Sequence, residues 1–329
     1  MEIDSISLQS VENGTRFDKM VEAPFDYLID HTSGKNLRGM IIQTFNLIYK
    51  VPTSELKTLE EIVNILHVSS LIIDDVEDNS KMRRGKPCAH QIFGNPQSIN
   101  CANYMYFKAM RLTAKLFGDD AAELKNKAIS IFIEEMLNLH HGQGLDLYWR
   151  DNFVCPSESE YVQMVMNKTG GLFRLSTRLM GLVSGFYCPE LIELSNLLGI
   201  LYQVKDDYLN LQSEAYQGKK GYCEDISEGK FSFPVIHAVL KYGVGKGSQP
   251  EGEGQELLSI LKLRTQDPIL KRHCLELIEC AGSLDYSKQT IHNLEIKARE
   301  LINRIIDRYD DDPKHQKAFL MALSQLAMM

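Results

Sequence analysis

Residues 69–85 of the chain read SSLIIDDVEDNSKMRRG. An apolar segment leads into three aspartates, and two adjacent arginines follow. In a helix, residues four positions apart share a face, so Asp74 and Asp78 would point the same way with Asp75 beside them. Like charges at this spacing destabilise a helix unless positive charge lies between them, and Mg²⁺ with oxygen ligands is a common source of that charge. A solvated helix end is the simpler alternative.

A second aspartate cluster favours the metal interpretation. Residues 203–211 read QVKDDYLNL and follow an apolar helical run at 194–201. Gln203, Asp206 and Asn210 fall on one helical face. Two carboxylate clusters on separate helices can face each other across a cavity and hold several metal ions. No other segment of the sequence repeats this pattern as clearly.

The remaining sequence has helical periodicity. Leu59, Ile62 and Leu66 form the apolar stripe of the helix that carries the first aspartates. Further helical patterns cover residues 97–117, 121–144, 158–186, 189–212, 231–242, 254–264, 267–280 and 284–308. Because convincing alternating strands are absent, the sequence predicts an all-α fold, a single-domain bundle of long helices around a central cavity. We expect residues 1–19 to form a flexible N-terminal tail and residues 20–329 to form the helical domain.

Four further motifs point to one family. They are the arginine pair at 83–84, GKNLR at 34–38, HGQGLD at 141–146 and NKTGGLFR at 167–174. With the two aspartate-rich motifs, they resemble the trans-isoprenyl diphosphate synthases, and the two longer strings are similar to those of the fungal geranylgeranyl diphosphate synthases. The match extends over roughly residues 20–240, with its motifs in the family's order and spacing. It implies the isoprenoid synthase type of helical bundle.

The resemblance implies a Mg²⁺-dependent prenyltransferase. Such an enzyme condenses isopentenyl diphosphate with an allylic diphosphate (dimethylallyl, geranyl or farnesyl) by ionisation, condensation and elimination. Positive charge must gather on the departing diphosphate, as in other phosphate chemistry. A nucleophile from the protein is not needed, because the proton lost after condensation passes to the released diphosphate. The expected product is geranylgeranyl diphosphate, which has a C20 chain.

The same resemblance implies a set of metal ligands. About three Mg²⁺ ions are expected per site. Asp74 and Asp78 would hold two of these ions, and Asp206 would hold the third. The remaining predicted ligands, direct or through water, are Asp75, Asp207 and Asn210. An alternative role for Asp207 is to fix Lys230 or a water ligand from outside the metal site.

Two sets of polar side chains are implied for the two diphosphates. The set for the allylic diphosphate is Arg83, Lys168, Thr169, Gln203, Lys220 and Lys230. The set for isopentenyl diphosphate is Lys35, Arg38, His67 and Arg84. The residues expected to act directly in catalysis are Lys168, Thr169, Gln203, Lys220 and Lys230. Taken singly, a lysine is usually a solvated surface charge and a histidine on an apolar helix is usually core, but the joint pattern favours diphosphate binding.

Product length is expected to depend on the cavity beyond the first aspartate motif. Ser69 and Ser70 lie about one helical turn before the first aspartate, where short-chain members of the family carry bulky aromatic side chains. These serines leave room for a product longer than C15. By resemblance to the fungal-type enzymes, the floor of the cavity comes from other helices through Tyr106, Phe107 and His140. Alternatively, this aromatic cluster is simply core.

Three alternative functions follow from the same motifs. A class I terpene cyclase also uses an aspartate-rich helix, but its second metal site usually has a hydroxyl residue where this chain has Asn210. A regulatory subunit of the same fold is non-catalytic, and such subunits typically lose one aspartate motif, whereas this chain keeps both. The chain could also be the prenyltransferase domain of a larger bifunctional terpene synthase.

Composition narrows the location and the partners. The net charge of −8 argues against a nucleic-acid binder, whose surface would be basic. Seven scattered cysteines without a Cys-x-x-Cys pair fit reduced thiols in a cytoplasmic protein. An N-terminus with Glu2 and Asp4 and no basic residue before Arg16 does not read as a signal or transit peptide, and no apolar run is long enough to span a bilayer. By resemblance the protein is expected to be a homodimer.

Overall fold

The described residues form an all-helical bundle, as the sequence predicts. A computed structural model describes residues 16–31, 36–212, 222–243, 252–310 and 312–327. Its helices are α1 (Arg16–His31), α2 (Leu37–Tyr49), α3 (Thr53–Glu77), α4 (Ala89–Phe93), α5 (Asn95–Ala114), α6 (Ala122–Asn152), α7 (Glu158–Lys168), α8 (Gly171–Ser184), α9 (Pro189–Gln212), α11 (Glu224–Glu228), α12 (Phe233–Lys241), α13 (Glu253–Leu263), α14 (Pro268–Cys280), α15 (Ser283–Tyr309) and α16 (Pro313–Ala327). Two short strands, β1 (Met82–Arg83) and β2 (Lys86–Pro87), pair in antiparallel register just after α3.

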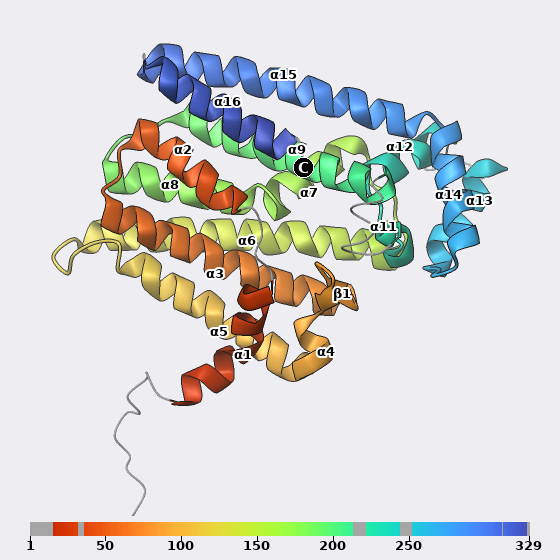
Figure 1. The fold of residues 1–329 in the computed structure, drawn as a ribbon, viewed down its shortest axis with the longest axis horizontal. Helices are drawn as coiled ribbons and strands as arrows, with labels where there is room; N and C mark the ends of the chain where they lie inside the picture. Colours follow the sequence, from red (N-terminus) through yellow and green to blue (C-terminus); the bar gives the residue numbers. More distant parts are fainter. Residues whose placement is uncertain (1–15, 32–35, 213–221, 244–251, 311, 328–329) are drawn as a thin grey trace, which may run out of the picture.

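Apolar stripes on the long helices build the core. Leu59, Ile62 and Leu66 of α3 are each 0% exposed, which confirms the predicted stripe. The helix α3 packs against α5 and α8, and α9 packs against α8 and α15. Figure 1 shows α15 crossing above α9 with α16 lying along it, so the C-terminal helices cover one side of the bundle. The ends of α3 and α9 that carry the aspartates are thereby held on a packed frame.

One predicted helix is broken in two. The pattern at 158–186 forms α7 and α8, which are separated at Thr169 and Gly170. The helix α9 comes very close here, since a Cβ atom at Gly199 would lie 2.7 Å from the Gly170 Cα. The end of α7 is equally close, since a Cβ atom at Gly170 would lie 2.6 Å from the Met166 carbonyl oxygen. Only glycine permits these approaches. The helical pattern did not reveal the break, because apolar residues continue on both sides of it.

The other helix boundaries agree with the predictions within a few residues, with some exceptions. The helix α6 continues to Asn152, whereas the sequence pattern ended at residue 144. The short α11 and the C-terminal α16 were not predicted. The helix α1 begins at Arg16, so helical structure starts before the boundary expected at residue 20, and residues 1–15 lie outside the described part of the chain.

All seven cysteines are free thiols, as their spacing predicts. None of the helices in the described ranges is both long enough and apolar enough to cross a bilayer. The cytoplasmic location stays a prediction.

Candidate active site

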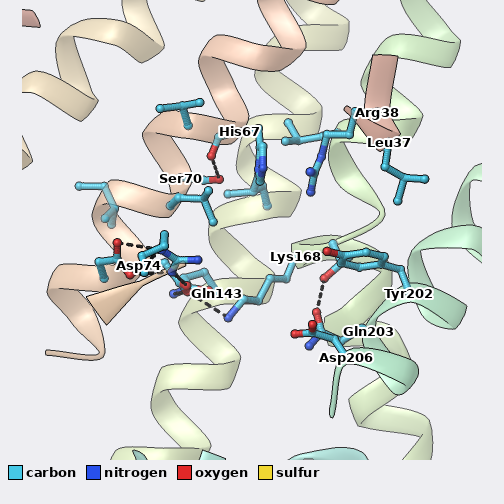
Figure 2. A pocket seen from close by; sticks show the side chains of 18 of the residues that line it. Leu37, Arg38, His67, Ser70, Asp74, Gln143, Lys168, Tyr202, Gln203 and Asp206 are labelled. Atoms are coloured by element: carbon cyan, nitrogen blue, oxygen red, sulfur yellow. Dashed lines mark hydrogen bonds and ion pairs between the residues drawn. The ribbon is translucent and has the colours of Figure 1, made fainter. Parts of the chain in front are cut away.

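A cavity of about 1260 Å³ lies between the aspartate-bearing ends of α3 and α9. Asp74 and Asp78 line it from the end of α3, and Asp206 lines it from α9. Figure 2 shows Asp74 and Asp206 on opposite sides of the pocket, with the side chain of Lys168 between them. The two acid-bearing helices therefore face one cavity, as the sequence predicts.

The ribbon β1–β2 returns Arg83 to the acids of α3. The Arg83 Nε lies 2.7 and 2.8 Å from the two carboxylate oxygens of Asp75, and its Nη2 lies 3.2 Å from Asp74 Oδ2. Burial alone would lower the pKa of Arg83, but the charges of Asp75 and Asp74 outweigh it and raise the pKa. Arg83 therefore stays charged and neutralises part of the first cluster.

Lys168 connects the first cluster to α6. Its Nζ lies 2.7 Å from Asp146 Oδ2 and 3.5 Å from Asp74 Oδ1. The close packing of α6 on the end of α7 makes this possible, because a Cβ atom at Gly142 would lie 2.5 Å from the Lys168 backbone nitrogen. Burial alone would lower the pKa of Lys168, but Asp146 and Asp74 outweigh it and raise the pKa, so the ammonium group keeps its charge.

In the second cluster, Asp207 is fully enclosed. Its Oδ1 accepts hydrogen bonds from Gln203 Nε2 at 2.9 Å and Lys230 Nζ at 3.2 Å. Its Oδ2 accepts from the Tyr161 hydroxyl at 2.6 Å and the Phe233 backbone N–H at 2.9 Å. Asp207 is 1% exposed and does not line the cavity. These four donors use both oxygens, so the geometry favours the alternative role considered for Asp207, which is to hold Lys230.

A chain of hydrogen bonds runs from Thr169 to this buried aspartate. The Thr169 hydroxyl donates to Gln203 Oε1 at 2.8 Å, and the Gln203 amide nitrogen donates to Asp207. Since the amide nitrogen is directed at a carboxylate, the orientation of the Gln203 side chain is fixed. Thr169 sits at the break between α7 and α8, which places its oxygen at the cavity wall.

Two basic side chains lie together at another part of the cavity. Figure 2 shows Arg38 from α2 and His67 from α3 pointing toward the same space. Burial lowers the pKa of His67 well below its ordinary value, and the charges of Arg38 and Arg84 lower it further, so this imidazole is neutral at pH 7. Burial also lowers the pKa of Arg38, whose Nε has no hydrogen-bond partner in the described ranges. A half-buried guanidinium facing a cavity is suited to bind an anion.

The oxygen donors of the two clusters fit Mg²⁺. Burial raises the pKa of Asp78 to about 6, with the like charge of Asp74 adding to the effect, and a bound cation would relieve this repulsion. Among the residues that the structure describes, no three His, Cys, Asp or Glu side chains come close enough together to hold an ion. Water and diphosphate oxygens would therefore complete the coordination, as is usual for Mg²⁺.

Comparison with known proteins identifies the family. The model of the polyprenyl synthetase family matches residues 18–278 of this chain. The chain belongs to the polyprenyl synthetase family. This confirms the identification made from the motifs, and polyprenyl synthetases generally use Mg²⁺.

Similar polyprenyl synthetases occur in fungi. The chain is 47% identical to a geranylgeranyl pyrophosphate synthase of Macrophomina phaseolina, over 88% of this chain and 84% of that protein. It is 45% identical to one of Aspergillus fumigatus, over 90% of this chain and 78% of that protein. A third, from Penicillium canescens, is 44% identical over 88% of this chain and 82% of its own length.

Most of the site residues predicted from the sequence line the one cavity. Those that do are Arg38, His67, Ser70, Asp74, Asp75, Asp78, Arg83, Arg84, Tyr106, His140, Lys168, Thr169, Gln203, Asp206, Asn210 and Lys230. Lys35 and Lys220 lie outside the described residues. Asn210 is 2% exposed, and its side-chain oxygen accepts a hydrogen bond from the Asp225 backbone N–H at 3.1 Å. This hydrogen bond uses one lone pair of the oxygen that would bind a metal ion.

Two of the predicted chain-length residues do not reach the cavity. Ser69 is 0% exposed and donates its hydroxyl to the Ile65 carbonyl at 2.7 Å, so it faces the core. Phe107 is 68% exposed on the outer face of α5. For this chain, their placement in the cavity was wrong, because α3 and α5 turn these two side chains away from it. Tyr106 and His140 do line the cavity, with ring centroids 5.6 Å apart.

Several polar cavity residues were not assigned a role from the sequence, and four of them contact the two clusters or lie beside them. These four are Gln143, Asp146, Arg150 and Asp225. The first three are spaced by three and four residues along α6, which puts them on one helical face. The sequence analysis of α9 used this three-and-four spacing for Gln203, Asp206 and Asn210, and the same spacing in α6 would have revealed these three residues. Asp225 had no such signal, since it lies in a short helix that the sequence pattern does not reveal.

Proposed function

We propose that this polyprenyl synthetase makes geranylgeranyl diphosphate from isopentenyl diphosphate and allylic diphosphates. The observation that carries the proposal is the convergence of Asp74, Asp206 and Lys168 on one cavity. The names of the fungal relatives, which match most of the chain at about 45% identity, support the C20 product.

In the proposed reaction, the allylic carbon–oxygen bond breaks first, and its electrons leave with the diphosphate. The double bond of isopentenyl diphosphate then attacks the allylic carbon, and the proton lost from the new cation passes to the released diphosphate. When bound at Asp74, Asp78 and Asp206, about three Mg²⁺ ions would supply positive charge to the leaving group. Asp75 and Asn210 would support these ions from nearby.

The chain's own cations would hold the allylic diphosphate from two sides. Arg83 and Lys168 already lie against the first cluster, and Lys230 lies against the second. Because all three keep their charge in the buried site, they can pair with phosphate oxygens without taking up a proton. Lys220 is expected to join them on sequence grounds.

Isopentenyl diphosphate would bind at the basic part of the cavity. The proposed contacts are Lys35, Arg38, His67 and Arg84. Since His67 is neutral, it would bind through a hydrogen bond and not through charge. Thr169 and Gln203 both line the cavity and are joined by a hydrogen bond, and their oxygens would stabilise the allylic cation by their dipoles.

The C20 limit is proposed to come from Tyr106 and His140. Both line the cavity, while Ser70 adds little bulk there. Burial and the nearby charge of Glu77 raise the pKa of Tyr106, so its ring presents a neutral wall.

Incubation of the protein with isopentenyl diphosphate, farnesyl diphosphate and Mg²⁺ tests the proposal. A linear C20 diphosphate is expected. A cyclic hydrocarbon would indicate a terpene cyclase, and no product in any combination of substrates would indicate a non-catalytic subunit.

We also propose that the protein is a homodimer. Exposed apolar side chains gather on α5 and α6, namely Ile99, Phe107, Ile133 and Leu137. Exposed apolar side chains on two helices that pack together support a protein interface there. Light scattering coupled to size-exclusion chromatography should give about twice the 37.5 kDa chain mass, whereas a monomer would contradict the proposal.

A further inference from the structure

Arg150, near the end of α6, makes a direct ion pair with Asp78. Its Nη1 contacts Asp78 Oδ1, and its Nη2 donates to the Glu77 carbonyl oxygen at 3.1 Å. Glu77 is the last residue of α3, so this carbonyl is one of those left without a partner inside the helix. One guanidinium group therefore holds both the last carboxylate of the first cluster and the C-terminus of the helix that carries it.

Arg150 is itself held by a second layer. Its Nε donates to Asp151 Oδ1 at 3.1 Å. Arg264, which follows α13, donates through Nη2 to the same Asp151 oxygen at 2.9 Å and to the Arg150 carbonyl at 3.3 Å. The Arg150 side chain is 9% exposed, so its three acceptors fix it in a nearly closed environment.

The same Arg264 reaches the other half of the site. A Cβ atom at Gly229 would lie 3.1 Å from the Arg264 Cγ and 3.0 Å from the Leu261 carbonyl oxygen. Gly229 directly precedes Lys230, which pairs with Asp207. The segment after α13 is thus packed between the part of the chain that carries Asp78 and the part that carries Lys230.

We propose that Arg150 is a positioning residue that holds the Asp78 carboxylate in the orientation that binds Mg²⁺, and that Asp151 and Arg264 hold Arg150 in turn. The inference rests on the proposed role of Asp78 as a metal ligand. Arg150 contacts Oδ1, which leaves Oδ2 for the ion. Without Arg150, the carboxylate beside Asp74 would turn away, since like charges repel. Residues of this outer layer typically change metal affinity by about 10- to 100-fold when they are replaced.

The test measures the Mg²⁺ concentration that half-maximally raises the melting temperature in the presence of inorganic pyrophosphate. We expect Arg150→Gln and Arg150→Lys each to increase this concentration about tenfold or more. The lysine variant keeps the charge but cannot reach both Asp78 and the Glu77 carbonyl, so it separates positioning from charge. Arg178→Gln is the matched control. Arg178, in α8, pairs with Glu134 and Glu135 of α6, the helix that also carries Arg150, and it does not line the cavity.

The outcomes are distinguishable. A lower Mg²⁺ requirement in Arg150→Gln would mean that Arg150 competes with the ion, and it would overturn the proposal, as would no change. If the Arg150 variants do not fold, Arg264→Gln is the test, because its side chain is 46% exposed and its replacement should leave the fold intact. We expect this variant to raise the half-maximal Mg²⁺ concentration about threefold, because Arg264 acts on Asp78 only through Asp151 and Arg150. Asp78→Asn separates the two proposals: an unchanged Mg²⁺ requirement there would refute the metal role of Asp78 itself.

Discussion

The ammonium group of Lys168 lies 2.7 Å from the carboxylate of Asp146, on a helix packed so closely that only glycine fits at position 142. The same ammonium lies 3.5 Å from Asp74. Lys168 is therefore held between two acids at the centre of the cavity, where a diphosphate leaving group can replace one of them as its partner.

Removing this cation should slow the reaction without unfolding the protein. We expect Lys168→Gln to lower kcat/KM for farnesyl diphosphate by about 10²- to 10³-fold, the usual effect of losing one stabilising group at a developing negative charge. Steady-state kinetics measures the change. Lys125→Gln is the control, because Lys125, in the first turn of α6, forms an exposed ion pair with Asp119 and does not line the cavity. Equal rates for both variants would remove Lys168 from the mechanism.

The two proposed primary metal ligands should be indispensable. Asp74→Ala and Asp206→Ala are each expected to lower turnover about a thousandfold or more, because neither opposing cluster can be replaced by the other. Circular dichroism should show an unchanged helical content. Near-normal turnover in either variant, at saturating Mg²⁺, would contradict the metal assignment.

The neighbouring residues Asp206 and Asp207 should respond differently to the same substitution. Asp206→Asn should reduce turnover with little change in melting temperature, since Asp206 faces the cavity. Asp207→Asn should destabilise the fold by about 2–4 kcal/mol, because an amide cannot accept all four of the donors around this buried carboxylate. Thermal unfolding of the two variants gives the comparison, and equal stability would show that Asp207 is not the structural member of the pair.

Metal binding should weaken in acid. The pKa of Asp78 is raised to about 6, so a proton competes with Mg²⁺ below that pH. We expect the Mg²⁺ concentration needed for half-maximal thermal stabilisation to rise about tenfold per pH unit below pH 6 and to level off above pH 7. In the metal-free protein, the folded state binds this proton more tightly than the unfolded chain does. The contribution of Asp78 to the free energy of unfolding therefore falls as the pH rises from about 4 to 6.

The control for this pH profile is Asp78→Asn. The titration is made with inorganic pyrophosphate present, as in the test of Arg150, and pyrophosphate also takes up protons in this range. The variant lacks the Asp78 carboxyl group, so its profile shows the pH dependence that comes from pyrophosphate. A profile with the same slope in the variant and the parent protein would show that Asp78 is not the group that titrates.

Product length gives a second matched pair of neighbours. Tyr106→Ala should yield chains longer than C20, because the ring lines the cavity. Phe107→Ala should leave the C20 product unchanged, since this side chain lies on the outer face of α5 and does not line the cavity. Chromatography of the dephosphorylated products measures both. Unchanged chain length in the Tyr106 variant would assign the ring to the core alone.

Helical spacing predicted the fold and the two aspartate clusters, and the family resemblance supplied the other predicted residues that line the cavity. The stripe on α3 and the aspartates at the ends of α3 and α9 follow from periods of three and four residues. Spacing along one helix cannot show what another helix covers. The sequence therefore left two roles open for Asp207, metal ligand or partner of Lys230, and the contacts of Tyr161 and Lys230 favour the second. For the same reason, the sequence could not separate Tyr106 from Phe107.

The hydrogen bond from Lys205 Nζ to the Leu326 carbonyl oxygen, at 3.3 Å, has a practical meaning for handling the protein. Lys205 precedes Asp206, and Leu326 in the last turn of α16 lines the same cavity. An affinity tag joined behind α16 would be attached within one helical turn of a residue that lines the cavity. Kinetic comparisons between variants are therefore best made with the tag ahead of α1, whose first residues do not line the cavity.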